Sequence, residues 1–210
     1  MHTVIKQFDK NVIMQKSIDF LSKKDQTLKN IISNYGHPTI EKRDEGFASM
    51  CHIILEQQVS IASAKACYVK IQNHFSFITP KIILNSNDDE LASCGISRQK
   101  ISYLKDLASK VISNEIDFSS FSSKSEAQIR AELITVKGVG NWSIEVYLMF
   151  CLQLEDIIPL GDIAIKNTII ELYENHSFEE MQLLSQNWKP YRTMASFILW
   201  HYYLKKRRRI

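Results

Sequence analysis

The residue best suited to chemistry is Asp162, which follows Pro159-Leu-Gly161 and comes directly before an apolar periodic segment. An aspartate in that position is a good helix N-cap, because its side-chain oxygen can accept hydrogen bonds from the first backbone N–H groups of the helix. A carboxylate held at the edge of a binding site can also stabilise positive charge that develops on a substrate. The two roles are compatible, and position alone does not separate them.

A second chemical feature is the segment Leu133-Ile-Thr-Val-Lys-Gly-Val-Gly-Asn-Trp142. One helical pattern ends at Lys137 and another begins at Trp142, so Gly138 and Gly140 must form a very tight turn. A turn without side chains brings backbone N–H groups close to an anion, and the N-terminus of the next helix adds a favourable dipole. We therefore predict a helix-hairpin-helix that binds a nucleic-acid phosphate, with a plain connection between two helices as the alternative.

The elements that must position these residues are all helical by pattern, because apolar residues recur at helical spacing and no strand alternation is present. The sequence predicts a serine-rich linker over 117–125, and helices that begin directly after the capping residues Thr79, Ser97 and Ser125. The other expected helices span 12–32 (around Ile18, Leu21, Leu28 and Ile31), 45–57 (Phe47, Met50, Cys51 and Ile54 inward), 61–75, 80–84, 88–94, 98–112, 142–152, 163–173, 177–186 and 190–205. The fold class is therefore all-α.

Composition describes a globular chain of 210 residues, 45% hydrophobic and 23% charged, which is long enough for a substantial core. No apolar run approaches a membrane span, and the N-terminus lacks a secretory segment, so we expect an intracellular protein with no membrane partner. Five positive charges lie in the tail Lys205–Arg209, whose default interpretation is a solubilising end and whose alternative is an enlarged phosphate-binding surface.

Cysteines contribute no recognisable metal or redox motif. The four of them, Cys51, Cys67, Cys94 and Cys151, are scattered without a CxxC pair or a close histidine. This spacing argues against zinc, an iron–sulfur cluster or a disulfide framework. We expect buried thiols and no metal site.

An ordered series of motifs then resembles the helix-hairpin-helix (HhH-GPD) DNA glycosylase superfamily, in its 3-methyladenine DNA glycosylase II branch. The resemblance covers about residues 45–205 and rests on the order and spacing of the motifs together. They are Gln57-Gln-Val-Ser60, Gly95-Ile-Ser97 with Lys100, Lys137-Gly-Val-Gly-Asn-Trp142-Ser, Leu160-Gly-Asp162, and Trp188-Lys-Pro-Tyr-Arg192 with Trp200. It implies one domain over 1–210, in which subdomains of about 45–125 and about 1–44 plus 126–210 flank a cleft. The N-terminal helix is expected to pack on the C-terminal lobe.

The implied activity is that of a monofunctional glycosylase, which hydrolyses the N-glycosidic bond of alkylated purines (3-methyladenine and 7-methylguanine type) and leaves an abasic site during base excision repair. Asp162 matches the catalytic aspartate, which stabilises an oxocarbenium-like sugar. Trp142 and Trp200 match residues that line the base pocket. The alternative is that the tryptophans are core residues, and this alternative is strongest for Trp188. Trp142 also stands where the bifunctional branch has its Schiff-base lysine, so hydrolysis without strand cleavage is expected. Val146 replaces a tyrosine of the resembling enzymes.

The same resemblance supplies the DNA contacts: Gly138, Val139, Gly140 and Asn141 of the hairpin, and Gln57, Gln58 and Ser60 of the preceding motif. Gln58 aligns with the residue that enters the vacated base stack, where this branch often has an apolar side chain. The alternatives are that Gln58 forms a hydrogen bond with the orphaned base or caps a helix end. The partner is double-stranded DNA containing alkylated bases, bound by a monomer. No cofactor is required, although the family allows a monovalent cation at the hairpin. The expected compartment is the cytoplasm (nucleoid) of a bacterium or the nucleus of a eukaryote.

Two other functions remain open at this point. A non-catalytic helix-hairpin-helix DNA-binding module would use the hairpin as a phosphate clamp but would not require Asp162 with Trp142 and Trp200. A glycosylase for another damaged or mismatched base is the alternative within the enzymes. The missing hairpin lysine and cysteine cluster disfavour its best-known branches.

Overall fold

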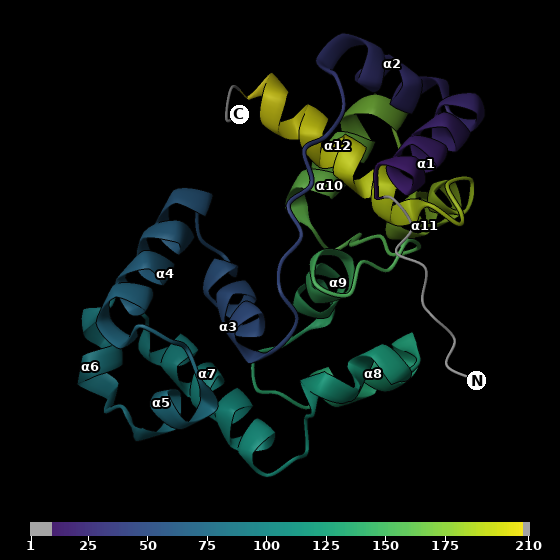
Figure 1. Ribbon diagram of the computed structural model, residues 1–210. Helices are drawn as coiled ribbons and strands as arrows, with labels where there is room; N and C mark the ends of the chain where they lie inside the picture. The colour runs from purple at the N-terminus through teal and green to yellow at the C-terminus, as the bar shows by residue number, and fades with distance from the viewer. Residues whose placement is uncertain (1–9, 208–210) are drawn as a thin grey trace. The chain divides into compact units, whose positions relative to one another are not determined.

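The computed structural model describes residues 10–207, and every regular element in this range is a helix (Figure 1). The all-α prediction is confirmed. Arg208 and Arg209 of the basic tail lie outside the described residues. The elements are α1 (Lys10–Lys24), α2 (Gln26–Tyr35), α3 (Phe47–Glu56), α4 (Ile61–Phe75), α5 (Pro80–Asn85), α6 (Asp88–Ser93), α7 (Arg98–Ile112), the 3-10 helix η1 (Phe118–Ser123), α8 (Glu126–Leu133), α9 (Asn141–Phe150), α10 (Ile163–Tyr173), α11 (Phe178–Gln186) and α12 (Arg192–Lys206).

The helices form two compact units. Unit 1 combines the N-terminal segment Met1–Ile40 with the C-terminal segment Leu154–Ile210, and unit 2 is the continuous segment Glu41–Gln153. This division differs from the predicted boundary near residue 125, because residues 126–153 group with unit 2. The physical reason is packing: α8 lies against α9, and α9 lies against α3, so the hairpin helices belong to the core of unit 2.

Unit 1 is built around α12, which packs on α10 from its own half of the chain and on α1 and α2 from the other half. The core includes five fully buried side chains, each 0% exposed: Leu21, Leu28, Ile165, Ile169 and Ile198. The N-terminal helices therefore complete a core that the C-terminal helices begin, as the family resemblance implied. Burying such side chains contributes about 1.5–3 kcal/mol each relative to exposure.

The expected single helix over 12–32 is wrong, because the chain breaks at Asp25 into α1 and α2. Asp25 has extended backbone angles, and its Oδ1 accepts hydrogen bonds from the backbone N–H groups of Thr27 and Leu28 at 2.9 and 3.0 Å. Its Oδ2 accepts from Trp188 Nε1 at 2.8 Å and from the Tyr173 hydroxyl at 3.0 Å. The apolar periodicity of the sequence continues through Asp25 and by itself predicts an unbroken helix. The bonds from Trp188 and Tyr173 stabilise Asp25 as a helix cap instead.

Unit 2 centres on α3, which contacts α4, α7 and α9, while α5 and α6 pack on α7. The serine-rich segment 117–125 was expected to be a linker, but most of it is a packed 3-10 helix. It forms η1, whose Phe118 and Phe121 are buried against Tyr147 of α9 with ring centroids 5.5 and 6.1 Å away. Two aromatic side chains among the serines therefore make the segment part of the core.

Three helix starts in unit 2 follow the capping residues that the sequence indicated. Thr79, Ser97 and Ser125 each accept a hydrogen bond from a backbone N–H in the first turn of the helix that follows, and Ser125 forms a full capping box. The last helix begins at Arg192, slightly later than the expected Pro190. Caps are local interactions, which is why sequence predicts them well.

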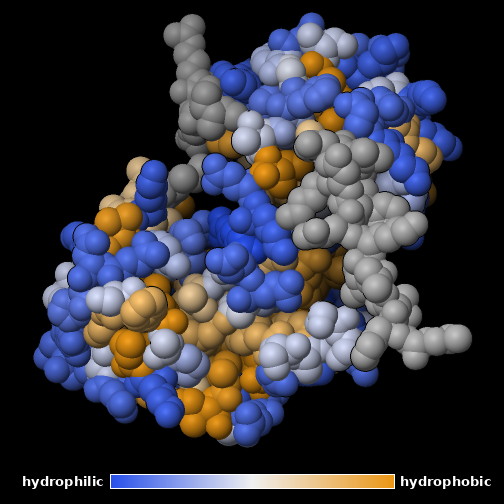
Figure 2. Space-filling model, in the orientation of Figure 1, coloured by the Kyte–Doolittle hydropathy of each residue, from blue (hydrophilic) through white to orange (hydrophobic). Residues whose placement is uncertain are grey.

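Figure 2 shows hydrophilic side chains over much of the visible surface, with smaller apolar patches. Among residues 10–207 no helix is both long and apolar enough to span a bilayer. The four cysteines are free thiols, three of them buried and Cys67 partly exposed, so the expectation of burial holds for Cys51, Cys94 and Cys151.

Candidate functional site

Asp162 is the N-cap of α10, as its sequence position predicted. Its backbone is extended (φ −74°, ψ 127°), and its Oδ1 accepts hydrogen bonds from the backbone N–H groups of Ala164 at 2.8 Å and Ile165 at 3.0 Å. The side chain is half-buried at the start of the helix. The capping bonds hold the carboxylate in one orientation, and the positive end of the helix dipole favours a negative charge there.

Trp200 makes a third hydrogen bond to the same oxygen. Its indole Nε1 donates to Asp162 Oδ1 at 2.9 Å from the middle of α12. The ring is half-buried against the unit 1 core and lies 6.0 Å from the ring of Phe197. The structure thus brings together two predicted site residues that are 38 positions apart.

A second aspartate–tryptophan pair in unit 1 has the same arrangement, but its tryptophan is buried in the core. Asp25 also caps a helix and also accepts an indole N–H, from Trp188. Trp188 is 0% exposed, so the alternative of a core role holds for this tryptophan. The Asp162–Trp200 pair differs because Trp200 retains exposed surface that a ligand could contact.

In unit 2 the hairpin connects α8 to α9 through a turn in which Gly138 has φ +75°. Val139 is buried and anchors the turn, whereas Gly138, Gly140 and Asn141 are exposed. Gly140 is the N-cap of α9 and supplies no side-chain cap. The first N–H groups of α9 therefore meet the requirements for binding an anion at a helix N-terminus.

Tyr103 of α7 contacts the hairpin, and the sequence did not indicate this contact. A Cβ added at Gly138 would come within 2.1 Å of the Tyr103 ring, so the ring of this α7 residue packs directly on the turn. Asp106 on the same helix accepts a hydrogen bond from the backbone N–H of Lys137 at 2.8 Å. The three-residue spacing of Tyr103 and Asp106 indicates that they share one face of a helix. The sequence does not indicate that this face contacts the hairpin.

Gln57 supports the hairpin from the end of α3. Its Nε2 donates to the Gly138 carbonyl at 2.9 Å and to Ser143 Oγ at 2.8 Å. Lys100 Nζ donates to the carbonyls of Leu55 at 2.7 Å and Gln57 at 2.8 Å, which are carbonyls at the C-terminus of α3. Lys100 entered the sequence motif without a role, and the structure gives it this bridging position.

Gln58 differs from its neighbour Gln57. It is exposed and has φ +54°, a left-handed conformation that costs a non-glycine residue roughly 1 kcal/mol or more. Val59 beside it is 46% exposed, and Ser60 caps α4 through a hydrogen bond from Ser63 N–H at 3.2 Å. The loop is thus fixed at both ends and presents Gln58 and Val59 at its tip.

The predicted site residues fall into two groups, one in each unit. Asp162 and Trp200 lie in unit 1, whereas Trp142 lies in the first turn of α9 in unit 2, together with the hairpin and the loop 57–60. Trp142 is half-buried, and Val146 one turn later is buried in the unit 2 core.

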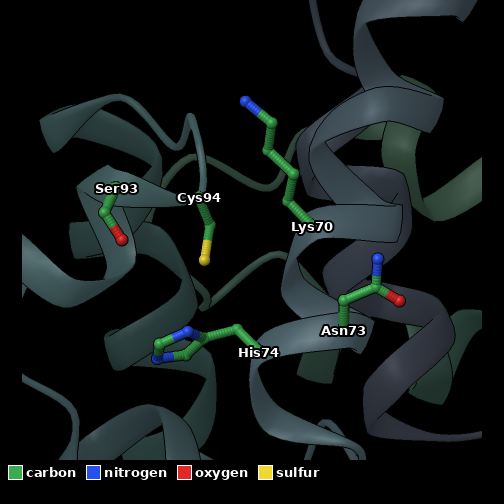
Figure 3. Close-up of a pocket in the computed structure, with 5 residues that line it drawn as sticks. All are labelled: Lys70, Asn73, His74, Ser93 and Cys94. Atoms are coloured by element: carbon green, nitrogen blue, oxygen red, sulfur yellow. The ribbon is translucent and has the colours of Figure 1, made fainter.

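No metal centre accompanies these groups: within residues 10–207, no cluster of three or more His, Cys, Asp or Glu side chains could hold an ion. An open pocket of about 310 Å³ in unit 2 contains none of the predicted site residues. Figure 3 shows Lys70, Asn73 and His74 on α4 on one side of it, with Ser93 and Cys94 on the other. His74 is paired with Glu90 at 2.9 Å.

The helical fold, the glycine hairpin and the capping aspartate together define the class of protein. Residues 51–192 match the HhH-GPD superfamily of base excision DNA repair proteins, and the chain belongs to this family. The predicted family is confirmed.

Particular relatives are more specific. DNA-3-methyladenine glycosylase 1 of Schizosaccharomyces pombe is 28% identical over 180 residues, which are 82% of this chain and 79% of that protein. The alkylbase DNA glycosidase-like protein mag2 of the same yeast is 30% identical over 190 residues, covering 86% of this chain and 89% of the relative. A structure of the S. pombe 3-methyladenine DNA glycosylase in complex with abasic DNA aligns with a TM-score of 0.78 and 26% identity, covering 91% and 97% of the two chains.

Proposed function

We propose that this protein is a monofunctional DNA glycosylase that removes alkylated purines, of the 3-methyladenine and 7-methylguanine type, from double-stranded DNA. The observation that carries the proposal is the Asp162–Trp200 hydrogen bond, which joins a fixed carboxylate to a partly exposed aromatic ring. Family membership and the names of the relatives support the same activity. The product is an abasic site, which later steps of base excision repair process.

In the proposed reaction the bond between the sugar carbon and the purine nitrogen breaks, and its electron pair neutralises the positive charge of the alkylated base. The sugar acquires oxocarbenium-like charge, which the Asp162 carboxylate stabilises. Water then forms the new bond to the sugar carbon and loses a proton to Asp162 or to solvent. Because the leaving base is already cationic, a protein general acid is not needed.

Trp200 has two parts in this proposal. Its N–H orients the carboxylate through the 2.9 Å bond, and its ring face attracts a cationic purine by about 0.5–2 kcal/mol. Trp142 remains a proposed base contact on the family resemblance. Attraction through a π face tolerates different ring shapes, so several alkylated purines are expected substrates.

We assign duplex binding to the hairpin and the loop 57–60. Exposed backbone at Gly138 and Gly140 and the uncapped start of α9 would bind a phosphate without reading sequence. Gln58, exposed in a left-handed conformation at the tip of an anchored loop, is the proposed residue that occupies the space of the extruded nucleotide. Gln57 has a supporting role, because its amide nitrogen is already bound to the hairpin.

The remaining parts of the proposal are a monomeric protein that needs no cofactor and acts where cellular DNA is found, in the nucleoid of a bacterium or the nucleus of a eukaryote. A monovalent cation bound by hairpin carbonyls is compatible with this activity but is not required by it.

The direct test is the release of free bases from a methylated DNA duplex, separated by chromatography. Wild-type protein is expected to release 3-methyladenine, and Asp162→Asn is expected to bind the same duplex without releasing it. Asp25→Asn is the matched control, because it changes the other tryptophan-bonded helix cap. Binding without base release by the wild type would instead support a non-catalytic DNA-binding module.

A further inference from the structure

The C-terminal end of α12 carries a stacked pair of side chains on the same helix as Trp200. The guanidinium of Arg207 lies over the ring of Tyr203, 3.8 Å from its centroid. Tyr203 is half-buried and Arg207 is exposed. A cation at this separation from an aromatic ring is held by the ring quadrupole, and an arginine held in this way keeps donors available at its edge.

The position of this pair around the helix axis is informative. Tyr203 is three residues after Trp200, so their side chains are neighbours on the helix surface. Arg207 is the C-cap residue directly after α12, and the contact of its guanidinium with Tyr203 keeps it near the face of the helix that carries Trp200. Seven residues correspond to about 10 Å along the axis, or about three base-pair rises of B-DNA.

The other two described basic residues of the tail point elsewhere. At 3.6 residues per turn, Lys205 and Lys206 lie about 120–140° around the axis from Trp200. Lys206 is paired with Glu171 of α10, which also accepts a hydrogen bond from the Tyr202 hydroxyl at 2.5 Å. Tyr202 itself is buried in the unit 1 core. Arg207 also interacts electrostatically with Glu171, and it lowers the pKa of that carboxyl less than Lys206 does.

We propose that Arg207, held on the Tyr203 ring, binds a DNA backbone phosphate beside the nucleotide that is presented to Asp162. This inference rests on the proposed function, since it takes Asp162 and Trp200 as the reaction site. The partner is a phosphate of the same duplex, and the planar guanidinium can donate two parallel hydrogen bonds to its oxygens. The alternative is that Arg207 only complements the C-terminal end of the α12 dipole, a role that Lys205 can share.

The test uses the full-length protein and a duplex containing one stable abasic-site analogue. Dissociation constants are measured between about 50 and 200 mM salt, where phosphate contacts have a strong effect. Arg207→Gln is expected to weaken binding roughly tenfold and to reduce the slope of log affinity against log salt by about 1. Lys205→Gln removes the same charge two residues away and is expected to reduce the slope by much less.

Arg207→Lys separates geometry from charge. It should keep most of the salt slope while losing affinity, because an ammonium group cannot make the planar paired contact. Melting temperatures of the three variants should match, since all three changes are at exposed positions. Equal effects of Arg207→Gln and Lys205→Gln would overturn the inference in favour of a nonspecific basic end.

The binding measurement is independent of catalysis, so the two proposals can fail separately. A wild type that releases no base, combined with an effect at Arg207 and none at Lys205, would retain the phosphate contact and remove the glycosylase assignment. An active enzyme in which Arg207→Gln binds with wild-type affinity and salt slope would remove the phosphate contact alone.

Discussion

Trp200 and Asp162 are joined by a hydrogen bond of 2.9 Å from the indole Nε1 to Oδ1, the same oxygen that caps helix α10. One carboxylate oxygen therefore accepts from two backbone groups and one side chain. The bonds come from two helices, α10 and α12, that pack against each other in the unit 1 core. The orientation of the carboxylate thus depends on the local cap and on the tertiary packing together.

Asp162→Asn is expected to fold normally, because asparagine is as good an N-cap as aspartate. Base release should fall by about 100-fold or more, since the negative charge that stabilises the developing sugar cation is lost. The measurements are the melting temperature and the rate of 3-methyladenine release from methylated duplex. Turnover at the wild-type rate would exclude Asp162 as the catalytic residue.

Trp200→Phe and Trp188→Phe form a matched pair, because each removes an indole N–H that bonds to a capping aspartate. Trp188→Phe should cost about 2–3 kcal/mol of stability, since it also leaves a cavity in a fully buried site. Trp200→Phe should cost less, because Trp200 is only half-buried. It should also reduce release of cationic 3-methyladenine more than release of neutral hypoxanthine.

The ratio of the two release rates, measured beside thermal melting, distinguishes packing from base contact. An unchanged ratio with a sharply lowered melting temperature for Trp200→Phe would make Trp200 a core residue. Trp188→Phe should leave the ratio unchanged in either case.

The two hairpin glycines should respond differently to alanine. Gly138→Ala is expected to destabilise the fold by about 1–3 kcal/mol, because φ is +75° and the new Cβ would collide with the Tyr103 ring. Gly140→Ala has ordinary backbone angles and no atom within 4 Å of the new Cβ. It should melt normally and yet bind duplex DNA more weakly, because the Cβ obstructs phosphate approach. Wild-type affinity for Gly140→Ala would leave the hairpin as a plain turn.

Borohydride reduction during the reaction should trap no covalent protein–DNA adduct. The position two residues after Gly140 is Trp142, which has no amine to form a Schiff base. The assay is electrophoresis of the protein after incubation with damaged duplex and reductant. A robust adduct would mean that a lysine elsewhere, with Lys137 the first to mutate, acts as a nucleophile.

Stability should depend on pH through Glu145 of α9. Burial raises the pKa of Glu145 to about 7, against the opposing effect of Arg130, whose Nη1 lies 3.7 Å from the carboxylate. The folded state then binds a proton that the unfolded state releases near its ordinary pKa of 4.5. The stability contribution is therefore present below pH 4.5 and is lost as pH rises towards 7.

Glu145→Gln provides the comparison. The melting temperature is measured at about pH 5 and at about pH 7.5. Its decrease from the lower to the higher pH should be larger for the wild type than for Glu145→Gln. A wild-type protein that is more stable at the higher pH, by an amount that Glu145→Gln abolishes, would mean that the Arg130 ion pair outweighs burial.

Sequence by itself determined the features that depend on neighbouring residues. Helix α10 and its cap Asp162 were predicted correctly, as were α7 with Ser97 and α8 with Ser125, because capping bonds span only two or three residues. Apolar periodicity identified the buried face of α3 for the same reason.

Only tertiary structure decided the relationships between distant residues. The helix break at Asp25 depends on Trp188 and Tyr173, more than a hundred positions away, and the grouping of residues 126–153 with unit 2 depends on α9 packing against α3. The contacts of Tyr103 with Gly138 and of Trp200 with Asp162 are set by how helices pack. Periodicity shows which face of a helix is buried, but the partner of that face is chosen by packing across the whole unit, which no local pattern contains.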